Sequence, residues 1–505
     1  MSKKKIDIQD AVDQIAQTAE ELGEKATEVI KTHLSIPSFG EQSADRKQVQ
    51  EDVRNVLQSQ RDFFATGTTL SVSWPIEQLK KLYDAIKRYE NDIYSALSAD
   101  LQKNPFDSYS TEIGIVLSEI SYAIRHVKKW SKTQKISSPL FMFPAKSKVF
   151  AEPFGMVLVI SSWNYPFQLS LAPLVSAIAA GNTVVLKASE YSTATNQVLR
   201  QILSDCFESN YVTFIEGGSL VNQLLLHERF NFIFFTGSQA VGKIIMESAA
   251  KHLTPICLEL GGKSPCIVEP SANIHTAARR IVWGKLLNAG QTCVAPDYVL
   301  VHESKKDEFL EAVRSEIAKQ YGENPLENEE YGKIINKKHF NRLISIAPEA
   351  QNDLETGKIA PTLLDLGPLG GEKASRHPSM QEEIFGPIMP VASYENLEDA
   401  ISYINSHPAP LALYLFTADK TVWEDIIQRV RFGGGCINDV VIQTANNLLP
   451  FGGMGESGMG QYHGKTGFDC FTHYKGIVFQ KEKGELNMRI TPHKNRLSLL
   501  RRIIK

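Results

Sequence analysis

The sequence predicts an α/β protein built on parallel sheets, and two observations lead to this prediction. Short apolar runs, typical of fully buried strands, alternate with helical patterns between about residues 156 and 251. A second alternation of the same kind begins after residue 262. Each unit would form a doubly wound sheet with helices on both faces, and such sheets bind ligands beyond the carboxyl ends of their strands. A chain of 505 residues is also longer than one core supports, so at least two domains are expected.

The elements of both units can be placed from these patterns. Two long amphipathic helices are expected first, at residues 76–101 and 110–130. The strands of the first unit are predicted at 156–161, 183–187, 212–216 and 231–236, with another ending at 260. Its helices are predicted at 168–180, 193–209, a short segment ending at 226, and 238–251. In the second unit, strands are expected near 267 and at 298–302, 389–394 and 411–417, and helices at 305–321 and 420–431.

The two ends of the chain have patterns of their own. Residues 8–31 carry apolar side chains at helical spacing, and 35–46 resembles a polar linker. We interpret residues 1–54 as a solvated helical extension and linker, although an interaction helix fits the same pattern. The tail at 481–505 mixes apolar residues with basic ones, which are Arg489, Lys494, Arg496, Arg501, Arg502 and Lys505 in its final part. Weak contact with anionic lipid and a frayed polar terminus both stay open for this tail.

The composition is that of an ordinary globular enzyme and argues against several other classes. Hydrophobic residues make up 43% and charged residues 22% of the chain, which argues against disorder. A formal net charge of −3 provides no field that would attract nucleic acid. The six cysteines form no CxxC pair and no zinc-like spacing with histidine, so we expect neither a disulfide framework nor a metal site. No apolar run reaches the roughly 18 residues of a membrane span and no secretory signal is recognisable, so a cytoplasmic protein is expected.

Two short motifs carry the candidate chemistry. Residues 290–293 (GQTC) place the Cys293 thiol on a loop of small residues, and Glu259 ends an apolar strand just before a Gly-Gly turn. A thiol can attack a carbonyl carbon, and a carboxylate can activate the water that releases the product. Because a free thiol is only a few per cent ionised at neutral pH, such a site should lower the thiol pKa or supply a base. Each residue also has an ordinary alternative, as a small buried cysteine or a surface carboxylate.

A candidate dinucleotide site follows the strand at 231–236. Residues 237–243 match the P-loop pattern GxxxxGK, but Ile244 stands where that motif needs a hydroxyl for magnesium, which argues against an ATPase. A helix beginning at Ser238 would still direct N–H groups and a positive dipole end at a phosphate. Gly237 and Gly242 would let a pyrophosphate and a neighbouring strand approach. Lys187 and Glu190, beyond another strand, could hold ribose hydroxyls or form an ordinary polar loop.

Several motifs in a common order carry a family resemblance. FTGS at 235–238, LELGGKSP at 258–265, GQTC at 290–293 and EEIFGP at 382–387 together resemble the aldehyde dehydrogenase superfamily. WNYPF at 163–167, KHLTP at 251–255, VAPDY at 294–298 and SGMGQYHGK at 457–465 are similar to its class 3, or fatty-aldehyde, branch. The resemblance runs from about residue 55 to 478 and so covers nearly the whole chain.

This resemblance implies an aldehyde dehydrogenase-like α/β fold. It has two doubly wound domains, one Rossmann-like for NAD(P) and one catalytic, and a small β oligomerisation hairpin. The NAD(P)-binding domain would comprise residues 55–135 and 152–260, and the catalytic domain residues 261–440. Residues 136–151 and 441–480 would form the oligomerisation element and the active-site loop. The resemblance also implies a homodimer.

The resemblance further implies NAD(P)-dependent oxidation of aldehydes, of medium or long chain or aromatic, to carboxylic acids. Cys293 would form a thiohemiacetal and then a thioester, and Glu259 would activate the hydrolytic water. The Asn164 amide and the N–H of Cys293 would stabilise the oxyanion, although Asn164 could instead cap the helix that follows. The cofactor would be NAD, with NADP left open, held by Lys187, Glu190, Gly237, Ser238, Gly242, Glu383, Phe385 and Trp163. Substrate contacts would come from Tyr165, Thr292 and Phe451, although Tyr165 and Phe451 could equally be core residues.

Two rival functions differ from this prediction at identifiable residues. A CoA-acylating dehydrogenase uses a thiol in place of water, and such relatives generally lack the carboxylate that Glu259 supplies. A non-catalytic relative would have lost its nucleophile or its oxyanion donor. Because Asn164, Glu259 and Cys293 are all present, hydrolytic aldehyde oxidation is favoured.

Overall fold

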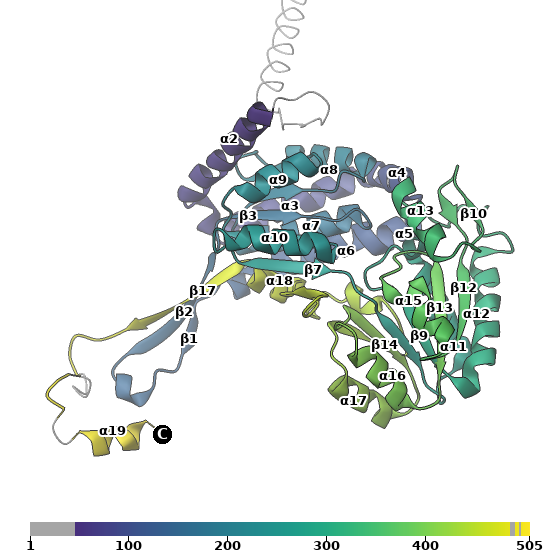
Figure 1. The fold of residues 1–505 in the computed structure, drawn as a ribbon. Coiled ribbons are helices and arrows are strands. Elements are labelled where there is room, and N and C mark those ends of the chain that lie inside the picture. The colour runs from purple at the N-terminus through teal and green to yellow at the C-terminus, as the bar shows by residue number, and fades with distance from the viewer. Residues whose placement is uncertain (1–45, 485–489, 494–495, 505) are drawn as a thin grey trace, which may run out of the picture.

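The computed structural model describes residues 46–484, 490–493 and 496–504, and it has two α/β lobes and a projecting arm (Figure 1). The helix predicted at 8–31 and most of the linker predicted at 35–46 lie outside the described residues, as do Arg489, Lys494 and Lys505 of the basic tail. Among the helices that are described, none is both long and apolar enough to cross a bilayer.

The first lobe is organised around a sheet in the strand order β16-β7-β6-β3-β4-β5. Its strands are β3 (Met156–Ile160), β4 (Thr183–Lys187), β5 (Val212–Ile215), β6 (Phe232–Gly237), β7 (Ile256–Leu260) and β16 (Gly458–Met459). All are parallel except β16, which pairs antiparallel with β7. The strands predicted in this lobe are confirmed. The two-residue β16 was not predicted, because two residues have no periodicity.

Helices cover both faces of this sheet because its strands are apolar on both faces. Val157 and Val159 pack on one face, and Leu158 and Ile160 on the other. The first face is covered by α3 (Ser73–Arg88), α4 (Glu90–Leu101), α6 (Gly114–Trp130), α7 (Pro166–Ala180), α8 (Thr193–Cys206) and α18 (Gly464–Cys470). The second face is covered by α2 (Arg46–Ala65), α9 (Ser219–His227) and α10 (Gln239–Ala250).

The two long helices predicted before the first strand are shorter than expected. The segment predicted as 76–101 is divided into α3 and α4 at Tyr89, whose backbone leaves helical geometry and whose hydroxyl donates to Asp205 at 2.6 Å. The segment predicted as 110–130 is helical from Gly114 as α6. Before it lie α5 (Pro105–Ser108) and a π-helical turn, η2 (Tyr109–Ile113). Apolar periodicity runs through both breaks, so it did not reveal them.

The second lobe is organised around a parallel sheet in the order β12-β13-β9-β8-β14-β15. The strands are β8 (Pro265–Val268), β9 (Tyr298–His302), β12 (Thr362–Pro368), β13 (Ile388–Tyr394), β14 (Ala412–Phe416) and β15 (Gly434–Ile437). The four predicted strands are confirmed. The edge strands β12 and β15 were missed because they are partly exposed and contain Gly or Pro. The helices include α11 (Ile274–Leu286), α12 (Lys306–Tyr321), α13 (Lys337–Ile346), α16 (Leu397–Asn405) and α17 (Lys420–Arg429).

The arm is an antiparallel sheet in the order β1-β2-β17 that extends away from both lobes (Figure 1). Its strands are β1 (Gln134–Ile136), β2 (Lys146–Pro153) and β17 (Thr472–Phe479). The short helix α19 (Leu497–Ile503) lies against η3 (Leu140–Met142) at its tip. This confirms the small β element expected from residues 136–151 and strands after about 465.

Candidate active site

A cavity of about 500 Å³ is lined by residues from both lobes. Its walls include most of the residues predicted for the site, namely Trp163, Asn164, Tyr165, Gly237, Ser238, Glu259, Thr292, Cys293, Glu383, Phe385 and Phe451. Lys187, Glu190 and Gly242 do not line it. The first-lobe residues lie at or just after the carboxyl ends of β3, β6 and β7, where a doubly wound sheet binds its ligands.

The Cys293 thiol is partly exposed to this cavity. Burial raises its pKa to about 12, and the carboxylates of Glu383 and Glu259 act in the same direction. The backbone N–H groups of Cys293 and Val294 oppose this by donating to the sulfur. The sequence led us to expect a lowered thiol pKa or a nearby base. The pKa is raised instead, because burial outweighs the two backbone donors, and neither carboxylate assists ionisation of the thiol.

Two glycines allow distant motifs to meet at the site. Gly290, with φ +78°, lies against the backbone of Gly386, and a Cβ there would collide with that carbonyl. Gly261 lies against the Glu383 carboxylate, which would collide with a Cβ at that position. The GQTC loop and the Gly-Gly turn therefore both pack directly on the EEIFGP segment. Glycine at these two positions lets the Gly386 backbone and the Glu383 side chain come close, which a residue with a Cβ would prevent.

Asn164 is buried and its side chain points at the nucleophile loop. Its Nδ2 donates to the carbonyl oxygen of Gln291 at 3.1 Å, two residues before Cys293. Its own carbonyl oxygen accepts from Asn288 Nδ2 at 2.8 Å. Tyr165 supplies no side-chain cap to α7, and neither does Asn164. The alternative in which Asn164 caps the helix is therefore not seen, and the oxyanion role stays a prediction.

Glu259 is 3% exposed and is the last residue but one of β7, beside the cavity. Cys257 Sγ donates to its Oε1 at 3.9 Å, whereas Oε2 has no hydrogen-bond partner among the described residues. Burial raises the pKa of Glu259 well above its usual range, and the neighbouring Cys470 contributes. A buried carboxylate with a free oxygen beside the cavity is placed to accept a hydrogen bond from a water molecule there.

The residues at the start of α10 fit the phosphate end of a dinucleotide. Gly237 ends β6, and Ser238 caps α10 by accepting from the Val241 N–H at 3.4 Å. Thr236, just before them, lines the cavity with a buried Oγ1 that lacks a partner in the described part of the chain. Free polar groups at a helix N-terminus are what an anionic ligand requires.

The remaining predicted cofactor residues fall into two groups. Trp163 and Phe385 line the cavity with their ring centres 5.5 Å apart. Lys187 ends β4, Glu190 lies in the loop that follows, and the two form an ion pair at 3.2 Å. Gly242 packs against the Leu260 side chain, so it allows α10 to approach β7 and does not line the cavity.

The three predicted substrate residues all line the cavity. The hydroxyls of Tyr165 and Thr292 are hydrogen-bonded at 2.6 Å, which joins the start of α7 to the nucleophile loop. Phe451 pairs with Tyr462 through the backbone, and its ring stacks edge-on against Tyr462 and His463. These rings form an apolar wall near the thiol.

Sequence reasoning missed several residues that shape the site. His339 and Arg342 of α13 line the cavity, and Arg342 donates to the backbone of Glu383 at 3.2 Å. Lys263 donates to the carbonyl of Glu382 at 3.0 Å and so holds the same segment. Lys263 stands within the LELGGKSP motif, which could have directed attention to it. The residues of α13 stand far from any motif and gave no comparable signal.

Comparison with known proteins gives matches over nearly the whole chain. The model of the aldehyde dehydrogenase family matches residues 37–477. The 4,4'-diaponeurosporen-aldehyde dehydrogenase of Staphylococcus aureus is 46% identical, over 88% of this chain and 97% of its own length. Aldehyde dehydrogenase family 3 member A2 of Rattus norvegicus is 41% identical, over 85% of this chain and 89% of its own.

Solved structures of aldehyde dehydrogenases share this fold over most of the chain. The substrate-bound state of Staphylococcus aureus AldH has a TM-score of 0.87 and 44% identity, covering 90% of this chain and 99% of its own. Betaine aldehyde dehydrogenase of the same organism, in complex with NAD+, has a TM-score of 0.77 and 26% identity, covering 87% and 89%.

Proposed function

Because this chain belongs to the aldehyde dehydrogenase family, we propose that Cys293, Glu259 and Asn164 divide the chemistry of aldehyde oxidation among them. The chain is an NAD(P)-dependent oxidoreductase that converts aldehydes to carboxylic acids. The observation that most supports the proposed roles is the shared cavity, in which a thiol, an amide and a partly unpaired carboxylate meet.

The proposed reaction begins at the sulfur. Cys293 Sγ gives up its proton to water in the cavity and forms a bond to the aldehyde carbon, and the carbonyl oxygen becomes an oxyanion that is stabilised by Asn164 Nδ2 and the N–H of Cys293. When bound, the dinucleotide supplies the oxidising equivalent, which leaves a thioester on Cys293. Glu259 then removes a proton from water, and the hydroxide attacks the thioester carbon and expels the thiolate. The product is the free carboxylic acid.

The cofactor is proposed to extend from the start of α10 to the rings near the thiol. Gly237 and Ser238 face its pyrophosphate, while Glu383, with Phe385 and Trp163, holds its nicotinamide end. Lys187 and Glu190 hold the adenosine ribose. The Glu190 carboxylate would repel a 2′-phosphate, so NAD is favoured, while use of NADP stays open.

The substrate is proposed to be a medium- or long-chain aliphatic or aromatic aldehyde. The cavity is lined in large part by apolar side chains, including Ile115, Leu169, Trp283, Phe451 and Tyr462. Ile442, at its wall, is 48% exposed, and Leu448 and Leu449 nearby in sequence are also exposed. An apolar wall that continues to the surface suits a substrate with a long apolar chain.

Steady-state and single-turnover assays test the proposed roles. Wild-type enzyme should reduce NAD with aldehydes from hexanal to hexadecanal and with benzaldehyde. Cys293→Ala should abolish this, whereas Cys436→Ala, at another partly exposed cysteine, should not. Glu259→Gln should lower the steady-state rate by about 10²–10⁴-fold but retain one rapid turnover per site, because thioester hydrolysis is blocked. Sustained release of free acid by Glu259→Gln would contradict the role of Glu259.

We propose that the enzyme is a cytoplasmic homodimer whose arm pairs with a second copy. All six cysteines are free, which is typical of a reducing compartment. The arm exposes Ile477, Val478 and Phe479 on β17, a strand at the edge of its sheet. An exposed apolar edge strand is readily extended by another chain.

The tip of the arm is proposed to make weak contact with an anionic membrane surface. Leu497, Leu499 and Ile504 at α19 are exposed beside Arg501 and Arg502. Leu140 and Phe143 near η3 are exposed as well. A small apolar surface next to basic side chains is suited to interfacial binding.

Vesicle sedimentation tests this contact. The protein should sediment with phosphatidylserine vesicles more than with phosphatidylcholine vesicles, and salt should weaken the binding because it screens the charges. Arg501→Glu with Arg502→Glu should abolish the difference, whereas Arg376→Glu, at a distant exposed arginine, should keep it. Equal sedimentation by all three proteins would argue against the contact.

A further inference from the structure

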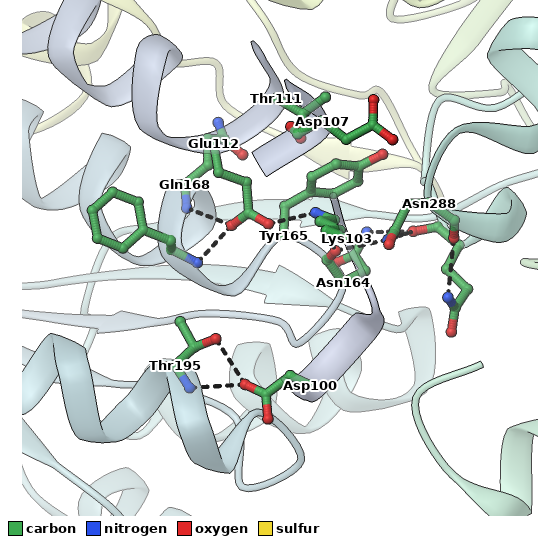
Figure 2. A network of polar contacts seen from close by, with 12 residues as sticks. Asp100, Lys103, Asp107, Thr111, Glu112, Asn164, Tyr165, Gln168, Thr195 and Asn288 are labelled. Atoms are coloured by element: carbon green, nitrogen blue, oxygen red, sulfur yellow. Dashed lines mark hydrogen bonds and ion pairs between the residues drawn. The ribbon is translucent and has the colours of Figure 1, made fainter. Parts of the chain in front are cut away.

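A buried ion pair lies behind the cavity and takes no part in the chemistry proposed above. Lys103 Nζ is paired with Glu112 Oε1, and both side chains are almost fully buried. Neither residue lines the cavity. Figure 2 shows that the pair lies directly beside Asn164 and Tyr165.

Lys103 contacts two of the predicted site residues. Its Nζ donates to the carbonyl oxygen of Asn164 at 3.4 Å. The same ammonium lies 3.9 Å from the centre of the Tyr165 ring, which is a cation–π distance. Burial lowers the pKa of Lys103, while Glu112 acts to raise it.

Glu112 takes the place of the missing helix cap of α7. Tyr165, at the N-cap position, provides no side-chain acceptor, and Pro166 has no N–H. The next two N–H groups, of Phe167 and Gln168, donate to Glu112 Oε2 at 2.8 and 3.2 Å. Glu112 belongs to the π-helical turn η2, an irregularity that is frequent at functional sites.

Asn164 is thereby held from two directions. Its carbonyl oxygen accepts from Lys103 on one side and from Asn288 Nδ2 on the other. Asn288 Nδ2 also donates to the Gln291 carbonyl at 3.2 Å, the group that accepts from Asn164 Nδ2. Tyr165 joins the same assembly through Thr292. The ion pair therefore connects the amide of Asn164 to the loop that carries Cys293.

Stability alone gives little reason for such a pair. Moving two charges out of water costs several kcal/mol per ion, and well-packed apolar replacements are often neutral or stabilising. A buried pair that holds a site residue through its backbone can instead affect the reaction rate. Displacing a reacting or stabilising group by about 1 Å can lower a rate by about 10²-fold.

We propose that Lys103 and Glu112 are positioning residues that set the location of the Asn164 amide relative to Cys293. Lys103 acts on the Asn164 carbonyl and the Tyr165 ring, and Glu112 acts on the first turn of α7. This inference rests on the proposed oxyanion role of Asn164. It adds two residues, from a segment that precedes every motif of the site, to the set on which the reaction depends.

Two neutral double variants of the full-length enzyme test the proposal. Lys103→Met with Glu112→Gln removes both charges and the donor to Asn164, and should lower kcat/KM for hexanal by about 10²-fold. Lys103→Gln with Glu112→Gln keeps an N–H donor and should stay within about tenfold of wild type. In both, alkylation of Cys293 by iodoacetamide should change by less than about twofold, because that reaction forms no oxyanion.

A matched control and a double-mutant cycle separate positioning from folding. Asp100, shown in Figure 2, caps α8 by accepting from the N–H groups of Ala194 and Thr195 at 3.1 and 2.8 Å. Asp100→Asn should lower the thermal midpoint with kcat/KM within about twofold of wild type. When Lys103→Met and Glu112→Gln are added to Asn164→Ala, kcat/KM should fall by less than about a further threefold. The reason is that the amide they position is already absent.

Four results would overturn the inference. Equal losses in the two double variants, or a parallel loss of Cys293 alkylation, would indicate a structural pair only. If the loss of kcat/KM from Lys103→Met with Glu112→Gln were as large in the Asn164→Ala enzyme as in wild type, the ion pair would act on another group. The role of Asn164 would then stand. If Asn164→Ala itself retained kcat/KM, the oxyanion role would fail, and this inference would fail with it.

Discussion

At the scale of single residues, two carboxylates oppose ionisation of the thiol they surround. Burial is the largest cause of the raised pKa of Cys293, and Glu383 contributes more than Glu259. Burial and Asp297 also raise the pKa of Glu383, to about 8. Glu383 is therefore mostly protonated at neutral pH and suppresses the thiolate only at higher pH.

This order of titration gives a prediction for the cofactor-free enzyme. At about pH 6.5, Glu383→Gln should leave the rate of Cys293 alkylation unchanged, because the wild-type side chain is already neutral. At about pH 9.5, wild-type Glu383 is ionised, so the variant should react up to about tenfold faster, the effect of one pKa unit. Iodoacetamide kinetics across this range provide the measurement.

The neighbouring acid provides the control for this prediction. Glu382 also lines the cavity, but its side chain is 62% exposed and Glu382 is not a cause of the thiol shift. Glu382→Gln should therefore follow the wild-type profile at every pH. An equal acceleration by both variants would show that Glu383 has no specific effect on the thiol.

At the scale of elements, α2 shows that the folded lobe begins before residue 54. The helix starts at Arg46, and Val49, Val53 and Leu57 pack against the sheet. Gln60 on the same face donates to the Val184 carbonyl of β4 at 2.9 Å. Residues 46–54, predicted as part of a solvated extension, thus supply part of the hydrophobic core in the described structure.

Truncation of a buried side chain in α2 measures this contribution. Leu57→Ala should lower the free energy of unfolding by about 2–5 kcal/mol, because the side chain is fully buried and leaves a cavity. Asn55→Ala, on the exposed face, should change it by less than about 0.5 kcal/mol. Denaturant titrations of both variants provide the test, and equal small effects would mean that α2 is held only weakly.

At the scale of the whole molecule, the cavity lies where two separately wound sheets meet. Asn164 follows β3 and Glu259 lies near the carboxyl end of β7 in the first lobe, whereas Cys293 and Glu383 belong to the second. The arm contributes nothing to the cavity walls within the described residues. Its exposed β17 edge is instead available to a second chain.

The proposed dimer can be measured directly. Wild-type protein should elute from size exclusion with the light-scattering mass of two chains. Ile477→Lys with Val478→Lys should shift it to the mass of one chain, because charges on an edge strand oppose pairing. Ile427→Lys, at an exposed isoleucine on α17, should remain dimeric. A monomeric wild type, or a dimeric arm variant, would contradict the proposed interface.

Much of the fold could be predicted because buried parallel strands have a recognisable local sequence pattern, a short run of apolar residues. The runs at β3, β4 and β6 are apolar on both faces, so composition alone identifies them. Edge strands such as β15, and breaks such as Tyr89, leave no such mark. Their positions depend on partners far along the chain.

The same division applies to the site. The sequence by itself determined the chemistry, because a thiol, a carboxylate and an amide stand in recognisable local motifs around Cys293, Glu259 and Asn164. Only the tertiary structure decided which other groups reach them, such as Lys103 and Glu112 behind Asn164. A charge buried by folding has no local signature, because its partners are brought together by packing and not by neighbouring positions in the chain.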